Sequence, residues 1–181
     1  MKIIETALPE VLLIEPEIHV DGRGQCWESF NERRFFSATG LRPGFVEDNH
    51  TRSTRGALHG LHYQIRQPQA KLVRVVFGEV FDVAVDLRKS SPNFGRWTGA
   101  VLSAENRLQM WIPEGFAHGF LVKSGTAEFL YKVTDFHAPQ HERAIRWDDP
   151  AIAVDWPLDA APILSAKDRI AKTLADAEVF A

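Results

Sequence analysis

The chain has 181 residues, of which 45% are hydrophobic and 25% are charged. This size and composition are typical of one globular domain, so we expect residues 1–181 to form a single domain around its own core. The formal net charge of −3 produces no overall field that would attract nucleic acid or an anionic membrane, and we expect neither as a partner.

Cys26 is the only cysteine, which excludes an internal disulfide framework and any zinc site built from several cysteines. The apolar stretch near the N-terminus is interrupted by Glu5, Pro9 and Glu10. It is too broken for a secretion signal and too short to span a bilayer. We therefore expect a cytoplasmic protein without a targeting segment.

The first predicted element is a short helix over residues 31–38. The Asn31 side chain is suited to capping the N-terminus of this helix, and Gly40 is suited to ending it. Most of the remaining chain is typical of β-structure. Short apolar and β-branched runs are separated by Gly, Pro, Asn or Ser every ~8–12 residues, a spacing found in sandwiches and barrels.

The clearest strands are Lys71–Phe77 and Val80–Leu87, and the two residues between them, Gly78 and Glu79, predict a hairpin. Alternation along the first strand places Lys71 and every second residue after it on one face. Further strands are predicted at Trp97–Ser103, Arg107–Ile112, His118–Val122, Ala127–Val133 and Arg143–Trp147.

The last predicted element is a C-terminal helix that begins at the capping pattern Ser165-Ala-Lys-Asp168 and extends to about Val179. Together the elements predict an all-β jelly-roll barrel with a short N-terminal helix and a C-terminal helix. Such a barrel offers an interior pocket lined by alternate residues of its strands.

Titratable groups are concentrated between residues 55 and 64, where His59 and His62 lie three residues apart. On a regular strand these two side chains point to opposite faces, whereas metal-binding barrels of this class present two histidines two apart on one face. The spacing therefore disfavours a metal site. A lone histidine is more often an ordinary hydrogen-bonded residue, so the functional interpretation depends on the residues that accompany it.

Those residues are Lys71, His118, Tyr131 and Asp168. Removal of a proton beside a carbonyl needs a base of near-neutral pKa, an orienting carboxylate, a cation at the enolate oxygen and an acid on the opposite face. Imidazole, aspartate, lysine and tyrosine are suitable groups. Asp168 has a competing structural role as a helix cap or as a first-turn partner of the helix dipole.

Several motifs then identify a family, because they occur in one order from about Ile14 to Asp168: Asp21-x-Arg23-Gly24, Gly60-Leu-His62-Tyr-Gln64, Ala70-Lys71-Leu-Val73, Asp82-Val-Ala-Val-Asp-Leu-Arg88, Ser91-Pro-x-Phe-Gly95, Trp111-Ile-Pro-x-Gly-Phe-Ala-His-Gly-Phe120 and Leu164-Ser-x-Lys-Asp168. The sequence resembles the dTDP-4-dehydrorhamnose 3,5-epimerase family. The resemblance implies a homodimeric, cupin-type jelly roll without metal or organic cofactor. It also implies conversion of dTDP-4-keto-6-deoxyglucose, a nucleoside-diphosphate 4-keto sugar, to dTDP-4-keto-rhamnose.

The same resemblance implies roles for individual residues. His62 corresponds to the general base and Asp168 to its partner. Lys71 corresponds to the cation at the C4 enolate oxygen, and Tyr131 to the acid on the other side of the sugar ring. The contacts to the pyrophosphate and nucleotide correspond to Arg23 (donated across the dimer), Glu28, Asn49, His118, Glu142 and Lys167. For Arg23 or Lys167 alone, an ordinary solvated charge explains the sequence equally well.

Three further substrate-binding positions and one residue next to them depart from the family pattern. Glu47 stands in place of a glutamine and His59 in place of an arginine, while Phe136 and His137 stand in place of two tyrosines. An ionised glutamate only accepts hydrogen bonds, so it suits the amino group of guanine or cytosine, and histidine lacks the bidentate fork of arginine. Two interpretations therefore stay open. The substrate is linked to GDP or CDP, or the same dTDP ligand is bound through altered contacts.

The number of inverted carbons is also open on these residues. One of the two replaced phenols lies near C5 in the family, so an epimerase of a single centre is the nearest alternative. His19 and Cys26 occupy positions where we expect an aromatic residue against the base. Two more distant hypotheses are a metal-dependent cupin that uses His59, His62 and His118, and a binding module without activity.

Overall fold

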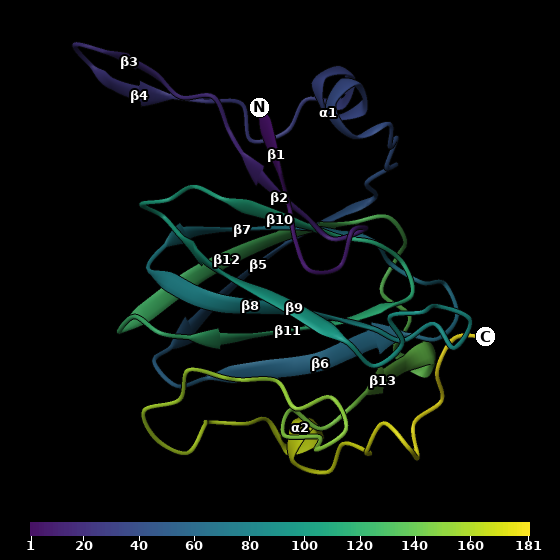
Figure 1. Ribbon diagram of the computed structural model, residues 1–181. Helices are drawn as coiled ribbons and strands as arrows, with labels where there is room; N and C mark the ends of the chain where they lie inside the picture. The colour runs from purple at the N-terminus through teal and green to yellow at the C-terminus, as the bar shows by residue number, and fades with distance from the viewer.

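Two antiparallel β-sheets packed face to face form the body of the protein in a computed structural model that describes residues 1–181 (Figure 1). The first sheet has the order β1 (Lys2–Glu5), β2 (Leu12–Glu15), β10 (Gln109–Ile112), β7 (Lys71–Phe77), β12 (Thr126–Val133) and β5 (Glu47–Thr54). The second has the order β13 (Glu142–Ala144), β6 (Leu58–Gln64), β11 (Phe116–Val122), β8 (Glu79–Asp86) and β9 (Trp97–Ser103). The predicted jelly-roll architecture is confirmed.

Smaller elements surround this sandwich. A separate two-stranded hairpin, β3 (His19–Asp21) and β4 (Gly24–Cys26), projects away from the body (Figure 1). The helical elements are α1 (Glu32–Thr39), the 3₁₀ turn η1 (Pro139–His141) and α2 (Ala166–Arg169). None of these has the length and apolar character needed to cross a membrane.

The main core fills the space between the two sheets. Val73 and Val75 enter it from β7, Val80 and Ala84 from β8, and Phe129 from β12. Alternation along β7 places Lys71 on the same interior face as these two valines, as predicted from the sequence. The core therefore ends at a polar side chain that faces inward.

The outer faces of both sheets are also covered. Helix α1 packs Phe35 against Leu72 and Trp111 on the first sheet. On the second sheet, apolar residues of the C-terminal segment, among them Ile152 and Trp156, cover the outer side of β6, β8 and β11. This segment contains α2, so packing on the outer face carries α2 to the end of β6.

The predicted hairpin at Gly78 is wrong. Strand β7 pairs with β10 and β12, whereas β8 pairs with β11 and β9 in the other sheet. Gly78 has φ +76° at the corner where the chain crosses between the sheets, and a Cβ there would lie 2.1 Å from the Thr126 carbonyl oxygen. A two-residue spacing predicts a sharp turn, but it does not distinguish a hairpin from a corner.

The two predicted helices have different outcomes. Helix α1 is confirmed with its expected caps, because the Asn31 side chain accepts a hydrogen bond from the Arg34 amide and Gly40 ends the helix at φ 75°. The C-terminal helix begins after Ser165 as predicted, but it ends at Arg169. Beyond that point Leu174 donates its backbone N–H to the Asp149 carboxylate. Isolated β-bridges at Lys172 and Phe180 also hold the chain against the second sheet. Its apolar residues are therefore buried without a helix.

Strand β6 contains a β-bulge, which corrects the predicted orientation of its histidines. His62 pairs with His118 and His59 with Phe120, so Gly60 and one further residue of β6 oppose a single residue of β11. The extra residue shifts the alternation of side chains by one position, so residues three apart on β6 point to the same face. His59 and His62 therefore line the same interior cavity. The prediction that they face opposite ways is wrong.

We expect the bulge to require a glycine at position 60. Gly60 has φ +118°, and a Cβ there would lie 2.6 Å from Gly119 Cα. Gly60→Ala should therefore lower the free energy of unfolding by about 2–4 kcal/mol, measured by urea denaturation. Gly125→Ala is the control, because nothing lies within 4 Å of its Cβ position, and a change within about 0.5 kcal/mol is expected. Equal stability losses in the two variants would contradict this requirement.

Candidate active site

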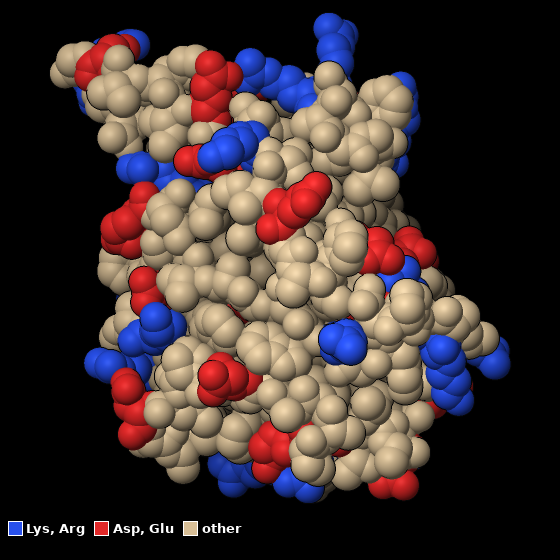
Figure 2. Space-filling model, viewed as in Figure 1, with Lys and Arg blue, Asp and Glu red and all other residues tan.

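A cavity of about 240 Å³ lies at one end of the sandwich and opens to solvent. Both sheets contribute to its walls. Most of the residues predicted from the sequence line it: Glu47, Asn49, His59, His62, Lys71, His118, Tyr131, His137 and Glu142. Elsewhere acidic and basic side chains are interspersed over the visible surface (Figure 2), so a phosphate group must be recognised by local contacts.

His62 and Asp168 form a close pair at this cavity. His62 Nε2 lies 2.5 Å from Asp168 Oδ1, and the aspartate is 3% exposed. Burial alone would raise the pKa of Asp168, but the hydrogen bond and charge of His62 outweigh it and hold that pKa below its usual value. A carboxylate only accepts, so Nε2 carries the proton and Nδ1 is left as the basic nitrogen.

Ser165 explains why the Asp168 side chain is available for this contact. The N-cap of α2 is Ser165, whose hydroxyl accepts a hydrogen bond from the Asp168 amide at 3.1 Å. Asp168 therefore lies in the first turn without serving as the cap. Its carboxylate points to the end of β6, which is where His62 lies.

Lys71 and Tyr131 approach from the opposite sheet. The Lys71 ammonium lies 5.9 Å from the centre of the Tyr131 ring. Burial lowers the pKa of Lys71 to about 8, although the charges of Asp82 and Glu142 act in the other direction. Burial, reinforced by nearby carboxylates, raises the pKa of Tyr131, so its phenol stays protonated at neutral pH.

A second histidine–aspartate pair lies deeper in the sandwich, and the sequence did not predict it. His118 Nε2 lies 3.1 and 2.9 Å from the two oxygens of Asp82, which is completely buried. Burial raises the pKa of Asp82, while His118 and Lys71 oppose that shift. The indication in the sequence was an aspartate inside the apolar run Val80–Leu87, since a buried charge requires a partner.

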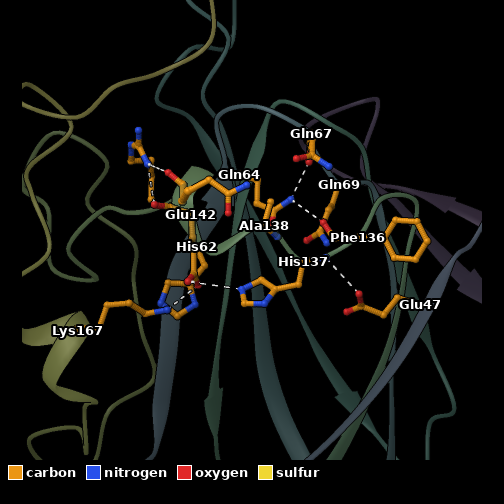
Figure 3. Close-up of polar contacts among 12 residues, drawn as sticks. Glu47, His62, Gln64, Gln67, Gln69, Phe136, His137, Ala138, Glu142 and Lys167 are labelled. Atoms are coloured by element: carbon orange, nitrogen blue, oxygen red, sulfur yellow. Dashed lines mark hydrogen bonds and ion pairs between the residues drawn. The ribbon is translucent and has the colours of Figure 1, made fainter.

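Five predicted residues form a chain of polar contacts along the rim, and Figure 3 labels all of them except Asn49. Glu47 accepts hydrogen bonds from the Asn49 side chain at 2.9 Å and from the His137 amide at 3.2 Å. His137 Nε2 lies 3.8 Å from one oxygen of Glu142, whose other oxygen lies 2.5 Å from the Lys167 ammonium. The rim therefore links β5 to α2 through residues of both sheets.

His59 occupies a different part of the wall. Its ring stacks on Phe120 with centres 4.6 Å apart, and its Nε2 lies 3.0 Å from the Ser53 hydroxyl. Burial, together with the charges of neighbouring histidines, lowers the pKa of His59. His59, His62 and His118 thus each have their own Nε2 partner, and no group of three or more His, Cys, Asp or Glu side chains in residues 1–181 is arranged to hold a metal ion.

Two predicted substrate-binding residues lie away from the cavity of their own chain. Arg23 is exposed at the turn of the projecting β3–β4 hairpin, where it pairs with Asp21 at 2.6 Å (Figure 1). Glu28 binds the Asn31 amide group and the Arg34 guanidinium, each at 2.8 Å. A single chain therefore does not bring these two residues to the other site residues.

The sequence missed several residues that complete the cavity. These are Thr51 on β5, Gln64 on β6, Gln69, Phe120 on β11 and Phe129 on β12. Phe120 and Phe129 stack with centres 4.2 Å apart and form an apolar wall that joins the two sheets. Thr51 was missed because β5, which is polar on both faces, was not predicted as a strand.

Comparisons with known proteins agree on one family. The sequence profile of the dTDP-4-dehydrorhamnose 3,5-epimerase family matches residues 5–176. The dTDP-4-dehydrorhamnose 3,5-epimerase of Pseudomonas aeruginosa is 61% identical over 180 residues, which cover 99% of each chain. The crystal structure of dTDP-6-deoxy-D-glucose-3,5-epimerase from Legionella pneumophila in complex with dTDP-4-keto-L-rhamnose has a TM-score of 0.95 and 51% identity, covering 98% of this chain and 94% of that one.

A structure with a narrower described activity is also similar. ChmJ, a 3'-monoepimerase from Streptomyces bikiniensis in complex with dTDP-quinovose, has a TM-score of 0.88 and 35% identity, covering 94% of this chain and 87% of that one. The family profile and the 61% identical relative both extend over nearly all of the sequence. The chain therefore belongs to the dTDP-4-dehydrorhamnose 3,5-epimerase family.

Proposed function

We propose that this protein is an isomerase that inverts C3 and C5 of dTDP-4-keto-6-deoxyglucose and so forms dTDP-4-keto-rhamnose. One observation carries the proposal: the groups needed for proton transfer stand on facing walls of one cavity. His62 with Asp168 belongs to the second-sheet wall, whereas Lys71 and Tyr131 come from the first sheet. A sugar ring between these walls meets a base on one face and an acid on the other.

The proposed reaction begins at His62. Its Nδ1 takes the proton from a carbon beside the C4 ketone, and the electron pair of the broken C–H bond forms the enolate double bond. The C4 oxygen then carries negative charge, which the Lys71 ammonium stabilises. Tyr131 delivers a proton to the opposite face of the same carbon, which inverts the centre. Exchange with solvent restores both groups, and the second carbon beside C4 reacts in the same way.

The negatively charged partners keep these groups in their reactive states. The Asp168 carboxylate fixes the orientation of the His62 ring and stabilises the imidazolium that forms during the reaction. The charges of Asp82 and Glu142 favour the charged form of Lys71 against its burial. These three carboxylates therefore support both the base and the oxyanion stabiliser.

We further propose that two copies pair and that residues 1–181 act as one jelly-roll domain in the cytoplasm. The projecting hairpin supports pairing, because it holds Arg23 exposed and away from its own cavity. In a dimer, Arg23 and Glu28 of one copy would bind the diphosphate and nucleotide in the cavity of the other. His59, His118 and Lys167 would supply contacts from within the chain.

A second candidate function is the inversion of a single centre. His137 lines the cavity at a position where the family has a phenol, and the similar ChmJ is described as a 3'-monoepimerase. Two of the similar structures hold a dTDP sugar, which favours a dTDP substrate over the GDP and CDP alternatives. Glu47 fits this choice, since both of its oxygens already accept hydrogen bonds within the chain.

The first prediction concerns the base and its carboxylate. In heavy water, His62→Asn should abolish deuterium uptake at the sugar while changing the affinity for dTDP by no more than several fold, because the imidazole acts in proton transfer. Asp168→Asn should slow exchange by about 10²–10⁴-fold, the scale found when a base loses its orienting carboxylate. NMR of the sugar protons measures both effects.

Asp149→Asn is the matched control for Asp168→Asn. Asp149 is equally buried, but its carboxylate accepts backbone N–H groups of Ile152 and Leu174 instead of facing the cavity. It should lose stability and keep its exchange rate once folded. Exchange near the unaltered rate in His62→Asn would remove the central claim.

The second prediction concerns pH. Lys71 stabilises the enolate only while charged, and its pKa is lowered to about 8, so kcat/KM should fall as pH rises through about 8. Arginine stays protonated throughout this range, so in Lys71→Arg the decline should disappear even if the overall rate is lower. The raised pKa of Tyr131 places its own loss of a proton at higher pH. An alkaline decline that persists unchanged in Lys71→Arg would assign it to another group.

The third prediction separates the two centres. If His137 replaces a phenol that assists at C5, deuterium should enter C3 much faster than C5, and His137→Tyr should raise the C5 rate selectively. Lys71→Gln should slow both centres, because they share one C4 enolate oxygen. Equal uptake at C3 and C5 in the unaltered protein would show that His62 and Tyr131 suffice for both, and the single-centre alternative would then fail.

A further inference from the structure

Gln64 connects β6 to the segment that carries His137. It is 4% exposed and lies two residues beyond His62 on the strand. Its Nε2 donates to the Gln67 carbonyl at 2.7 Å and to the Phe136 carbonyl at 3.3 Å, and its Oε1 accepts from the Ala138 amide at 2.7 Å (Figure 3). One side-chain amide thus holds the backbone on both sides of His137.

Apart from a hydrogen bond from Gln69 Nε2 to the Asp135 carbonyl at 2.8 Å, few contacts hold this segment against the body. The Phe136 side chain is 60% exposed and the His137 side chain is 55% exposed, so neither is anchored by packing. Ala138 is buried, but it is too small to fix the orientation of its neighbours. The other polar contact of the His137 backbone is its N–H, which donates to Glu47 at 3.2 Å. Hydrogen bonds from both sheets therefore determine where the imidazole enters the cavity.

The chemistry of the amide group suits this task. A planar amide presents a donor and an acceptor in a fixed relative direction, so it pairs with a carbonyl and an N–H of one segment in one orientation only. Because the amide is buried, loss of either bond leaves a backbone group without a partner, and the segment must move to recover one. The contact therefore fixes a position in addition to contributing stability.

We infer that Gln64 is a positioning residue that sets the affinity for the substrate by holding His137 at the rim of the cavity. The inference rests on the proposed function, in which the cavity receives a nucleotide-linked sugar. Gln64 lines the cavity, but its amide nitrogen and oxygen are both taken up by backbone partners, so it acts through His137. It leaves the His62–Asp168 pair in place, because the strand hydrogen bonds of β6 do not depend on its side chain.

Gln64→Leu tests the inference by replacing the amide with an apolar side chain of similar size. It should raise KM for dTDP-4-keto-6-deoxyglucose about tenfold and change kcat by less than about threefold, since binding is weakened and proton transfer is not. Gln109→Leu is the matched control. Gln109 is also buried, at 3% exposure, and its Nε2 donates to the Ser29 carbonyl at 2.8 Å away from the cavity. It should lower the melting temperature comparably and leave KM unchanged.

Gln64→Glu provides a second variant with its own signature. The ionised carboxylate can accept from Ala138 but repels the Phe136 and Gln67 carbonyls, whereas the protonated acid can pair with both sides. The ratio of its KM to that of the unaltered protein should therefore fall as pH is lowered. This variant decides the matter if Gln64→Leu does not fold.

The readouts separate the inference from the proposed function. A KM for Gln64→Leu within twofold of the unaltered value, or an equal rise in Gln109→Leu, would overturn the positioning role. Absence of turnover by the unaltered protein would instead overturn the proposed function. In that case calorimetric Kd values for dTDP decide the inference: a Kd about tenfold higher in Gln64→Leu than in Gln109→Leu supports it, and equal values reject it.

Discussion

The close approach of β6 and β11 at Gly60 and Gly119 determines which side chains face the interior. Only residues without a Cβ allow these backbones to meet, and the extra residue in β6 reverses the alternation along that strand. His59 and His62 consequently share one wall. The placement of His62 opposite Lys71 thus follows from the backbone geometry that two glycines allow. It does not depend on the contacts of the imidazole.

Charge pairing explains how this wall tolerates ionisable groups. Asp168 and Asp82 each bind one histidine, and Glu142 binds Lys167 at the rim. A buried carboxylate is costly unless hydrogen bonds or an opposite charge accompany it, so each of these three carboxylates has a basic partner on another element. The same pairing leaves one imidazole nitrogen of His62 without a carboxylate partner. The charges of Asp82 and Glu142 also oppose the lowering of the Lys71 pKa by burial. Stability and chemistry therefore depend on the same carboxylates.

Sequence patterns predicted a strand from the alternation of its side chains and a helix from the capping residues at its ends. Lys71–Phe77 and the cap residues of α1 were predicted correctly, because alternation and capping are local properties. Contacts distant in sequence decided the rest: the corner at Gly78, the extended course of the chain after Arg169 and the bulge at Gly60. Strand β5 was missed because its inward side chains are polar where they line a cavity. Asp82 was overlooked because nothing in a single strand identifies its partner on another.

The C-terminal segment supplies the carboxylate that pairs with His62, and it does so from far along the sequence. His62 and Asp168 are 106 residues apart, and their contact forms only when the segment has packed on the outer face of the second sheet. Pairings of such high contact order form late in folding, because a long loop must close first. On the ribosome the sandwich strands emerge before Asp168 does, so the barrel can assemble while His62, the proposed base, still lacks its carboxylate partner. The proposed catalytic pair is therefore completed at the last stage of chain synthesis.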